Sequence, residues 1–191
     1  MKQILVYGLG AIGSNLLVQM SKQYPDYKFS GIDFDKVEER NIRTQAYFLE
    51  QVGMAKADAM RIILARYNRK PNYTPVKRKV TESPGPAIKM VDLAIDCFDN
   101  TESRRYLAAC RNGNVLHIGF SPDYTAECIW NEDYDVPNDV DAVRADICSM
   151  GDAVPFIHFV VNAALLNISN WIETGNKSNF IVTGKGRIQW L

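Results

Sequence analysis

The sequence predicts an α/β fold in which helices flank a mostly parallel β-sheet, with mixed strands at the C-terminal end. Three observations support this prediction. Short apolar runs alternate with helical patterns through the first half of the chain, as in βαβ units. A glycine-rich turn joins the first apolar run to the first helical pattern. The 191 residues, 47% of them hydrophobic and 23% charged, match one globular domain, which we place over residues 1–191.

The first half of the chain predicts strands and helices in alternation. Apolar residues at helical spacing, from Ile12 to Met20, mark the first helix. Asp99, Asn100 and Thr101 are good capping residues and open a later helix. We expect strands at residues 4–7, 27–33, 91–97 and 115–120, and further helices at residues 55–67 and 101–111.

The second half departs from this pattern. Residues 126–130 predict a strand in a mixed part of the sheet, and residues 180–182 and 188–190 predict a closing hairpin. Residues 131–146 form an acidic segment, and long loops in small domains are often functional. Pro155 opens an amphipathic helix whose apolar face extends to Ile172.

The composition argues against several classes of protein. The 22 Lys and Arg residues balance 22 Asp and Glu residues, without the basic excess typical of proteins that bind nucleic acids or membrane surfaces. We expect no run near the roughly 20 apolar residues that span a bilayer, and no signal peptide. The four cysteines form no CxxC pair, so we expect reduced thiols and a cytoplasmic location.

A nucleotide cradle is the clearest functional signal. Gly8, Gly10 and Gly13 form a GxGxxG between the first strand and the first helix. Such glycines permit a tight turn, a close approach of phosphate to the backbone, and close helix–strand packing. Asp33 follows 20 residues after Gly13, where an acid can bind ribose hydroxyls. We therefore expect a Rossmann-like nucleotide-binding domain.

The cradle alone does not choose between NAD and ATP. Arginine and asparagine cluster at residues 40–43, and Lys56 and Asp99 follow at later strand–helix junctions. Hydride transfer does not need this combination of cationic and acidic side chains. Nucleotidyl transfer needs cations to neutralise the triphosphate and a carboxylate to hold Mg²⁺. This set favours Mg·ATP.

At this point the chain resembles the ThiF/HesA/MoeB family of ATP-dependent adenylyltransferases, in the superfamily of the ubiquitin-activating enzymes. Four family motifs occur in order. They are GxGxxG at residues 8–13, DxDxV…N…RQ at 33–45, GxxKA at 53–57 and D…DNxxxR at 96–104. The resemblance extends from Ile4 to about Ile172.

The resemblance implies specific roles for the matching residues. The cofactor-binding residues it implies, together with the cradle glycines, are Gly8, Gly10, Ala11, Gly13, Asp33, Asn41, Arg43, Lys56, Asp99 and Asn100. Among these, Gly10 and Ala11 line the phosphates, Asp33 binds the ribose, and Asp99 holds Mg²⁺. Plainer interpretations stay open: Asp33 as a solvated strand end, Lys56 as a surface lysine of its helix, and Asp99 with Asn100 as only a helix cap.

Cys148 lies between the acidic segment and the long helix. It resembles a family cysteine that in some members forms a thioester or acyl-disulfide with the activated partner, and a place near a helix N-terminus favours a thiolate. An inert, half-buried thiol is the alternative. Arg104 is expected to be a structural partner of the Asp99 turn, and His117 and His158 are expected to be packing residues.

The chain departs from the family pattern in three ways. The usual Arg-Gln reads Thr44-Gln45, so the γ-phosphate contact shifts to Arg43 or Arg40 or is lost. Many members supply an arginine from an N-terminal helix across a dimer interface, and here we expect that arginine to be absent or to come from elsewhere. The two CxxC pairs of the family's zinc site are missing, and we expect no structural zinc.

The resemblance implies an enzyme that adenylates the C-terminal carboxylate of a small ubiquitin-like or sulfur-carrier protein. ATP and Mg²⁺ would be its cofactors, and Arg43, Lys56, Asp99 and Cys148 its catalytic residues. A homodimer is expected, with no nucleic acid or membrane as partner. Two alternatives remain: a catalytically inactive ThiF-like nucleotide-binding scaffold and an NAD-binding redox protein.

Overall fold

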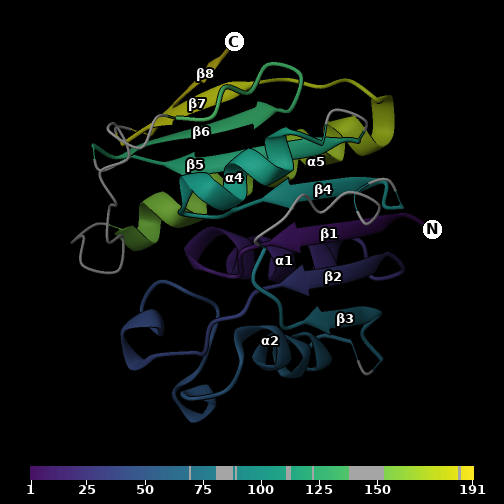
Figure 1. Ribbon diagram of the computed structural model, residues 1–191, viewed down its shortest axis with the longest axis vertical. Coiled ribbons are helices and arrows are strands. Elements are labelled where there is room, and N and C mark those ends of the chain that lie inside the picture. The colour runs from purple at the N-terminus through teal and green to yellow at the C-terminus, as the bar shows by residue number, and fades with distance from the viewer. Residues whose placement is uncertain are drawn as a thin grey trace.

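A single β-sheet forms the centre of the computed structural model (Figure 1). The structure describes residues 1–68, 70–80, 88, 90–110, 113–121, 123–137, 153–184 and 186–191. Within these residues the sheet has eight strands in the order β3-β2-β1-β4-β5-β6-β7-β8. The strands are β1 (Gln3–Tyr7), β2 (Lys28–Ile32), β3 (Tyr73–Val76), β4 (Leu93–Asp96), β5 (Val115–Phe120), β6 (Thr125–Trp130), β7 (Phe180–Thr183) and β8 (Arg187–Trp190).

Strands β1 to β5 pair parallel with one another, and the pairs β5–β6, β6–β7 and β7–β8 are antiparallel. Tyr7 of β1 pairs with Ile32 of β2 on one side and with Asp96 of β4 on the other. The carboxyl ends of these three strands are therefore level at one edge of the sheet. This confirms the expected fold class and brings the segments after β1, β2 and β4 together.

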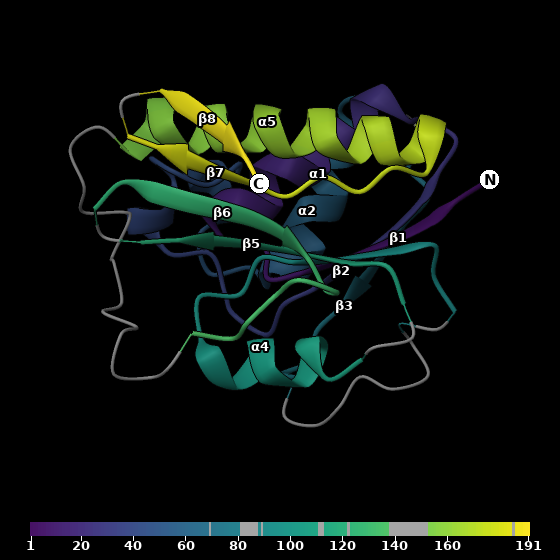
Figure 2. The same ribbon diagram turned by 90° about the horizontal axis from the view of Figure 1, so that it is seen from above.

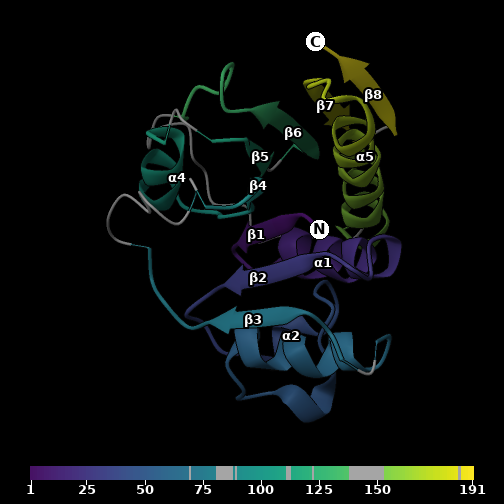
Figure 3. The same cartoon turned by 90° about the vertical axis from the view of Figure 1, so that its right-hand side faces the viewer.

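Helices cover both faces of the sheet (Figures 2 and 3). The helices α1, α2 and α5 pack into one apolar cluster and α4 borders the other. Because α1 follows β1 and α4 follows β4, adjacent strands send their helices to opposite faces. Such a switch point opens the crevice in which α/β proteins bind ligands. The helices are α1 (Ala11–Gln23), α2 (Lys56–Ala65), α4 (Thr101–Ala108) and α5 (Ala153–Thr174), with short 3₁₀ helices at Glu39–Asn41 and Leu49–Gln51.

Helix α5 is longer and more apolar than the sequence analysis expected. It begins at Ala153, two residues before Pro155. By length and composition alone, it could cross a membrane. The expectation that no segment approaches this size was therefore wrong. Half of the most apolar part of this helix is buried inside the protein. Its inner face packs on the sheet and on α1, where the Tyr24 hydroxyl donates to Ser169 Oγ over 2.7 Å. Core packing accounts for its apolar character.

Strand β3 was missed by the sequence analysis. It has four residues, includes Pro75, and continues directly into a basic stretch at residues 77–79, so it lacks the apolar run of its neighbours. The closing hairpin appears as β7 and β8, as expected. His158 is exposed, which corrects its expected role in packing. Cys148 and most of the acidic segment lie outside the described residues.

Candidate nucleotide-binding site

The turn between β1 and α1 requires glycine at two positions. Gly8 has a φ of +79°, and a Cβ there would lie 2.9 Å from the carbonyl oxygen of Cys97. A Cβ on Gly13 would lie 1.9 Å from the carbonyl oxygen of Gly8. The turn is therefore packed against the end of β4 on one side and closed by the first turn of α1 on the other. Two of the three cradle glycines serve this packing.

Gly10 has a different environment. It is the N-cap residue of α1, no side chain caps this helix end, and a Cβ built on Gly10 would meet nothing within 4 Å. The first N–H groups of a helix lack intrahelical partners and carry the positive end of the helix dipole. Gly10 thus borders open space at a helix end suited to a phosphate.

Asp33 lies directly after β2 and is held against the glycine turn. Its Oδ2 accepts a hydrogen bond from the Leu9 amide over 2.7 Å, and its Oδ1 accepts one from the Asp35 amide over 2.8 Å. The side chain is buried, with a 6% exposed fraction, so Asp33 is not a solvated strand end. The Tyr47 hydroxyl donates to the Leu9 carbonyl over 2.9 Å, so both peptide groups of Leu9 are fixed.

Lys56 is the first residue of α2, and it is buried rather than a surface lysine. Its amide donates to the Asp35 carbonyl over 2.9 Å, which brings the start of α2 to the end of β2. Its Nζ lies 3.5 Å from Asp35 Oδ2. Burial raises the pKa of the Asp33 carboxyl, and the nearby Lys56 ammonium partly opposes this shift. The structure therefore places a buried cation beside the Asp33 carboxylate.

The segment that carries Asn41 and Arg43 crosses the N-terminal turns of α1. Asn15 Nδ2 donates to the Thr44 carbonyl over 2.9 Å, and Ser14 Oγ accepts from the Ala46 amide over 3.1 Å. Asn41 is buried and its Oδ1 accepts from the Glu38 amide over 2.9 Å, so this side chain caps its own short helix. Arg43 is exposed. The phosphate contacts assigned to these two residues stay predictions.

The junction between β4 and α4 contributes the last predicted residues. Asn100 caps α4, because its Oδ1 accepts from the Ser103 amide over 2.8 Å. Asp99 is exposed near the glycine turn, which contacts the preceding Cys97. No cluster of three metal-ligating side chains occurs among the described residues. A lone carboxylate nevertheless fits Mg²⁺, which usually takes one or two carboxylates together with substrate phosphates.

A buried polar network beneath this junction was not foreseen. Asp96 Oδ2 and His117 Nδ1 are 2.8 Å apart, and His117 Nε2 and Asn131 Oδ1 are 2.9 Å apart. The guanidinium of Arg104 donates to the Phe98 carbonyl, which confirms that Arg104 supports the Asp99 turn. His117 was expected to be a packing residue, but both of its ring nitrogens have polar partners. The one sequence feature that could have indicated this buried network is a histidine within an otherwise apolar strand.

The raised pKa of Asp33 predicts a specific pH dependence of stability. In the unfolded chain the carboxyl loses its proton near the usual value of about 3.9, whereas the folded protein keeps it to higher pH. Between these two values the folded state binds more protons, so the free energy of unfolding falls as pH rises through that range. Asp33→Asn should remove this fall, measured by urea denaturation at several pH values. The exposed control Asp26→Asn should keep it, and an unchanged slope in Asp33→Asn would contradict the assignment.

Comparisons with known proteins agree with this geometry. A family model described as the ThiF family matches residues 1–120. Ubiquitin-like modifier-activating enzyme 5 from Drosophila ananassae is 30% identical over 136 residues, and that from Drosophila virilis is 28% identical over 128 residues. These alignments cover 63% and 60% of this chain, and 34% and 32% of the relatives. The chain thus spans about a third of the length of these relatives.

Solved structures share the fold over the whole chain. Escherichia coli MccB with MccA-N7isoASN superposes with a TM-score of 0.77 at 14% identity, covering 100% of this chain and 64% of MccB. PaaA superposes with a TM-score of 0.73 at 18% identity, covering 100% of this chain and 64% of PaaA. E. coli MccB is also solved with ATP. At these identities the matches establish the fold.

Proposed function

Because this chain belongs to the ThiF family, we propose that it is an ATP-dependent adenylyltransferase. Its substrate would be the C-terminal carboxylate of a small ubiquitin-like or sulfur-carrier protein, which it would convert to an acyl-adenylate. The matches to ubiquitin-like modifier-activating enzyme 5 support a small protein as partner. The ATP complex of MccB, a neighbour of the same fold, supports ATP as the nucleotide.

One arrangement carries the proposal: an uncapped helix N-terminus lies beside a buried aspartate and a buried lysine. Open space borders Gly10 at the start of α1. The Asp33 carboxylate accepts a hydrogen bond from the amide of Leu9, the residue before Gly10. This carboxylate is buried and suits ribose hydroxyls. Lys56 adds a buried cation that acts on Asp33 and lies 3.5 Å from Asp35 Oδ2. A nicotinamide cofactor has no use for this lysine, whereas a triphosphate does.

In the proposed reaction an oxygen of the partner's carboxylate attacks the α-phosphorus of ATP. The new bond joins that oxygen to the α-phosphorus, the bond to the bridging oxygen of the β-phosphate breaks, and pyrophosphate leaves. A carboxylate is already ionised at pH 7, so no side chain needs to act as a base. The residues of this chain orient the reactants and neutralise charge. Mg²⁺, which Asp99 would hold, would supply further charge neutralisation on the triphosphate.

Cys148 and a second copy of the chain complete the proposal. Cys148, which lies outside the described residues, would attack the carbonyl carbon of the acyl-adenylate through its thiolate, which forms a thioester and releases AMP, or else stay inert. A homodimer is proposed from the family resemblance, and a cytoplasmic location from the expectation that the four cysteines stay reduced.

ATP–pyrophosphate exchange tests the proposal directly. The chain is incubated with Mg·ATP, labelled pyrophosphate and a candidate partner that ends in Gly-Gly, and we expect label to enter ATP only when all components are present. A partner that lacks its last two glycines is the matched control. Mg·ATP binding without exchange would favour the inactive scaffold, and binding of NAD in preference to Mg·ATP would favour the redox alternative.

A further inference from the structure

Buried charged residues hold the two peptide groups that flank Phe98, the residue before Asp99. The Phe98 amide donates to Asp96 Oδ1 over 3.0 Å, and the Phe98 carbonyl accepts from Arg104 Nε over 2.8 Å. Phe98 immediately precedes Asp99, the residue assigned to Mg·ATP. The direction of the chain at Asp99 therefore depends on where Asp96 and Arg104 lie.

Residues of β5 in turn hold both Asp96 and Arg104 in place. Asp96 Oδ2 pairs with His117 Nδ1 over 2.8 Å, and Arg104 Nη2 donates to the Ile118 carbonyl over 2.8 Å. The side chains of Asp96 and His117 are completely buried. Burial opposes the charged form of Arg104, but the Asp96 carboxylate and Tyr134 outweigh it, so the pKa of the guanidinium is raised. Arg104 stays a cation and a donor.

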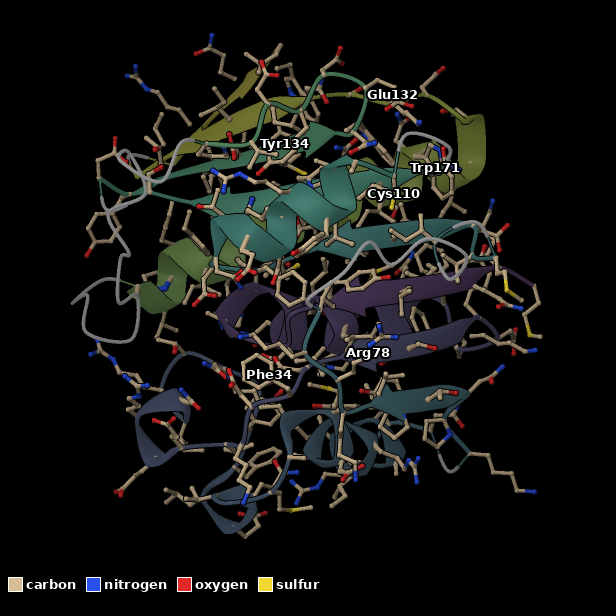
Figure 4. All side chains as sticks on the ribbon, viewed as in Figure 1. Phe34, Arg78, Cys110, Glu132, Tyr134 and Trp171 are labelled. Atoms are coloured by element: carbon tan, nitrogen blue, oxygen red, sulfur yellow. The ribbon has the colours of Figure 1, made fainter. Side chains whose placement is uncertain are left out.

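Tyr134 closes this network from the segment after β6 (Figure 4). Its hydroxyl accepts from Arg104 Nη1 over 2.9 Å. Its ring stacks on His117, with centroids 3.8 Å apart and planes 7° apart. Burial raises the pKa of the Tyr134 phenol, so it stays neutral at physiological pH. Space for the guanidinium comes from Gly119, where a Cβ would lie 3.1 Å from Arg104 Nη1.

We propose that Tyr134 is a positioning residue for Asp99. It holds Arg104, Arg104 holds the Phe98 carbonyl, and this contact sets where the Asp99 carboxylate meets the nucleotide. Tyr134 touches no substrate, and its effect passes through Arg104. The inference rests on the proposed function, in which Asp99 faces Mg·ATP.

Tyr134→Phe tests this inference, because it removes the hydroxyl and keeps the stacked ring. Tyr24→Phe is the matched control, since it removes a tyrosine hydroxyl bond on the other face of the sheet. The first readout is amide hydrogen exchange over residues 97–100, which does not depend on activity. We expect exchange there to be about fivefold faster in Tyr134→Phe, the factor expected from a net loss of one hydrogen bond, and unchanged in Tyr24→Phe.

The second readout is nucleotide binding measured by calorimetry with and without Mg²⁺. In Tyr134→Phe the Mg²⁺ concentration for half-maximal binding should rise about fivefold, while ATP binding without Mg²⁺ stays the same because the glycine turn is untouched. Wild-type values of both readouts in Tyr134→Phe, or equal changes in Tyr24→Phe, would overturn the role of Tyr134 and leave the proposed function standing. A wild-type protein that binds no Mg·ATP would overturn the proposed function itself.

Discussion

Lys56→Ala is expected to reduce ATP–pyrophosphate exchange by about a hundredfold or more, the usual cost of losing one preorganised charge-stabilising group. The reason is the position of its ammonium, which is buried beside Asp33 and lies 3.5 Å from Asp35 Oδ2. Lys56 is buried, and its ammonium acts on the Asp33 carboxyl, the group proposed to bind the ribose. Initial exchange rates at saturating Mg·ATP measure the effect.

Lys77→Ala is the matched control for this experiment. Lys77 Nζ lies 3.0 Å from Asp58 Oδ2, but the Lys77 side chain is exposed and Asp58 is half-buried, and ion pairs in contact with solvent contribute little. We expect exchange within about twofold of wild type for Lys77→Ala. Thermal unfolding shows whether each variant is folded. If Lys56→Ala remained folded and retained full exchange, Lys56 would have no part in the reaction.

Gly10→Val is expected to weaken ATP binding at least about tenfold, or ~1.4 kcal/mol, while the protein stays folded. The φ of Gly10 is −78°, which other residues adopt, and no atom lies within 4 Å of a Cβ built there. The Cβ of a valine would therefore lie in the open space at the start of α1, and its methyl groups would occupy that space. Because this space is assigned to phosphate, the effect should appear in the nucleotide affinity, measured by calorimetry.

Gly13→Ala provides the contrast that makes the Gly10 result specific. The new Cβ would lie 1.9 Å from the Gly8 carbonyl oxygen, so the turn must move. Overpacking of this kind costs about 1–3 kcal/mol or more of stability. We expect a lower midpoint of unfolding for Gly13→Ala and a nearly unchanged one for Gly10→Val. Normal ATP affinity in folded Gly10→Val would exclude phosphate from the N-terminus of α1.

The glycine turn and its neighbours could be predicted because their signals are local. A GxGxxG between an apolar run and a helical pattern requires only residues adjacent in sequence, and Asp33 follows at the end of the next strand. Asn100 was placed correctly at a helix start for the same reason, and the structure shows it as the cap of α4. The parallel strands followed from alternating strand and helix patterns.

The network around Tyr134 could not be predicted because its members are far apart in sequence. Asp96, Arg104, His117 and Tyr134 come from β4, α4, β5 and the segment after β6. No periodic pattern links these positions, and only the pairing of β4 with β5 brings the first and third together. The burial of Lys56 was likewise invisible, since it depends on how the start of α2 meets the end of β2.

A crystal structure of this protein with Mg²⁺ and a non-hydrolysable ATP analogue tests the proposed nucleotide site most directly. We expect the phosphates over the N-terminus of α1, the ribose hydroxyls on Asp33, and the side chains of Lys56 and Asp99 directed at the triphosphate and its metal. An empty crevice, or a bound analogue from which Lys56 and Asp99 point away, would contradict the proposed chemistry.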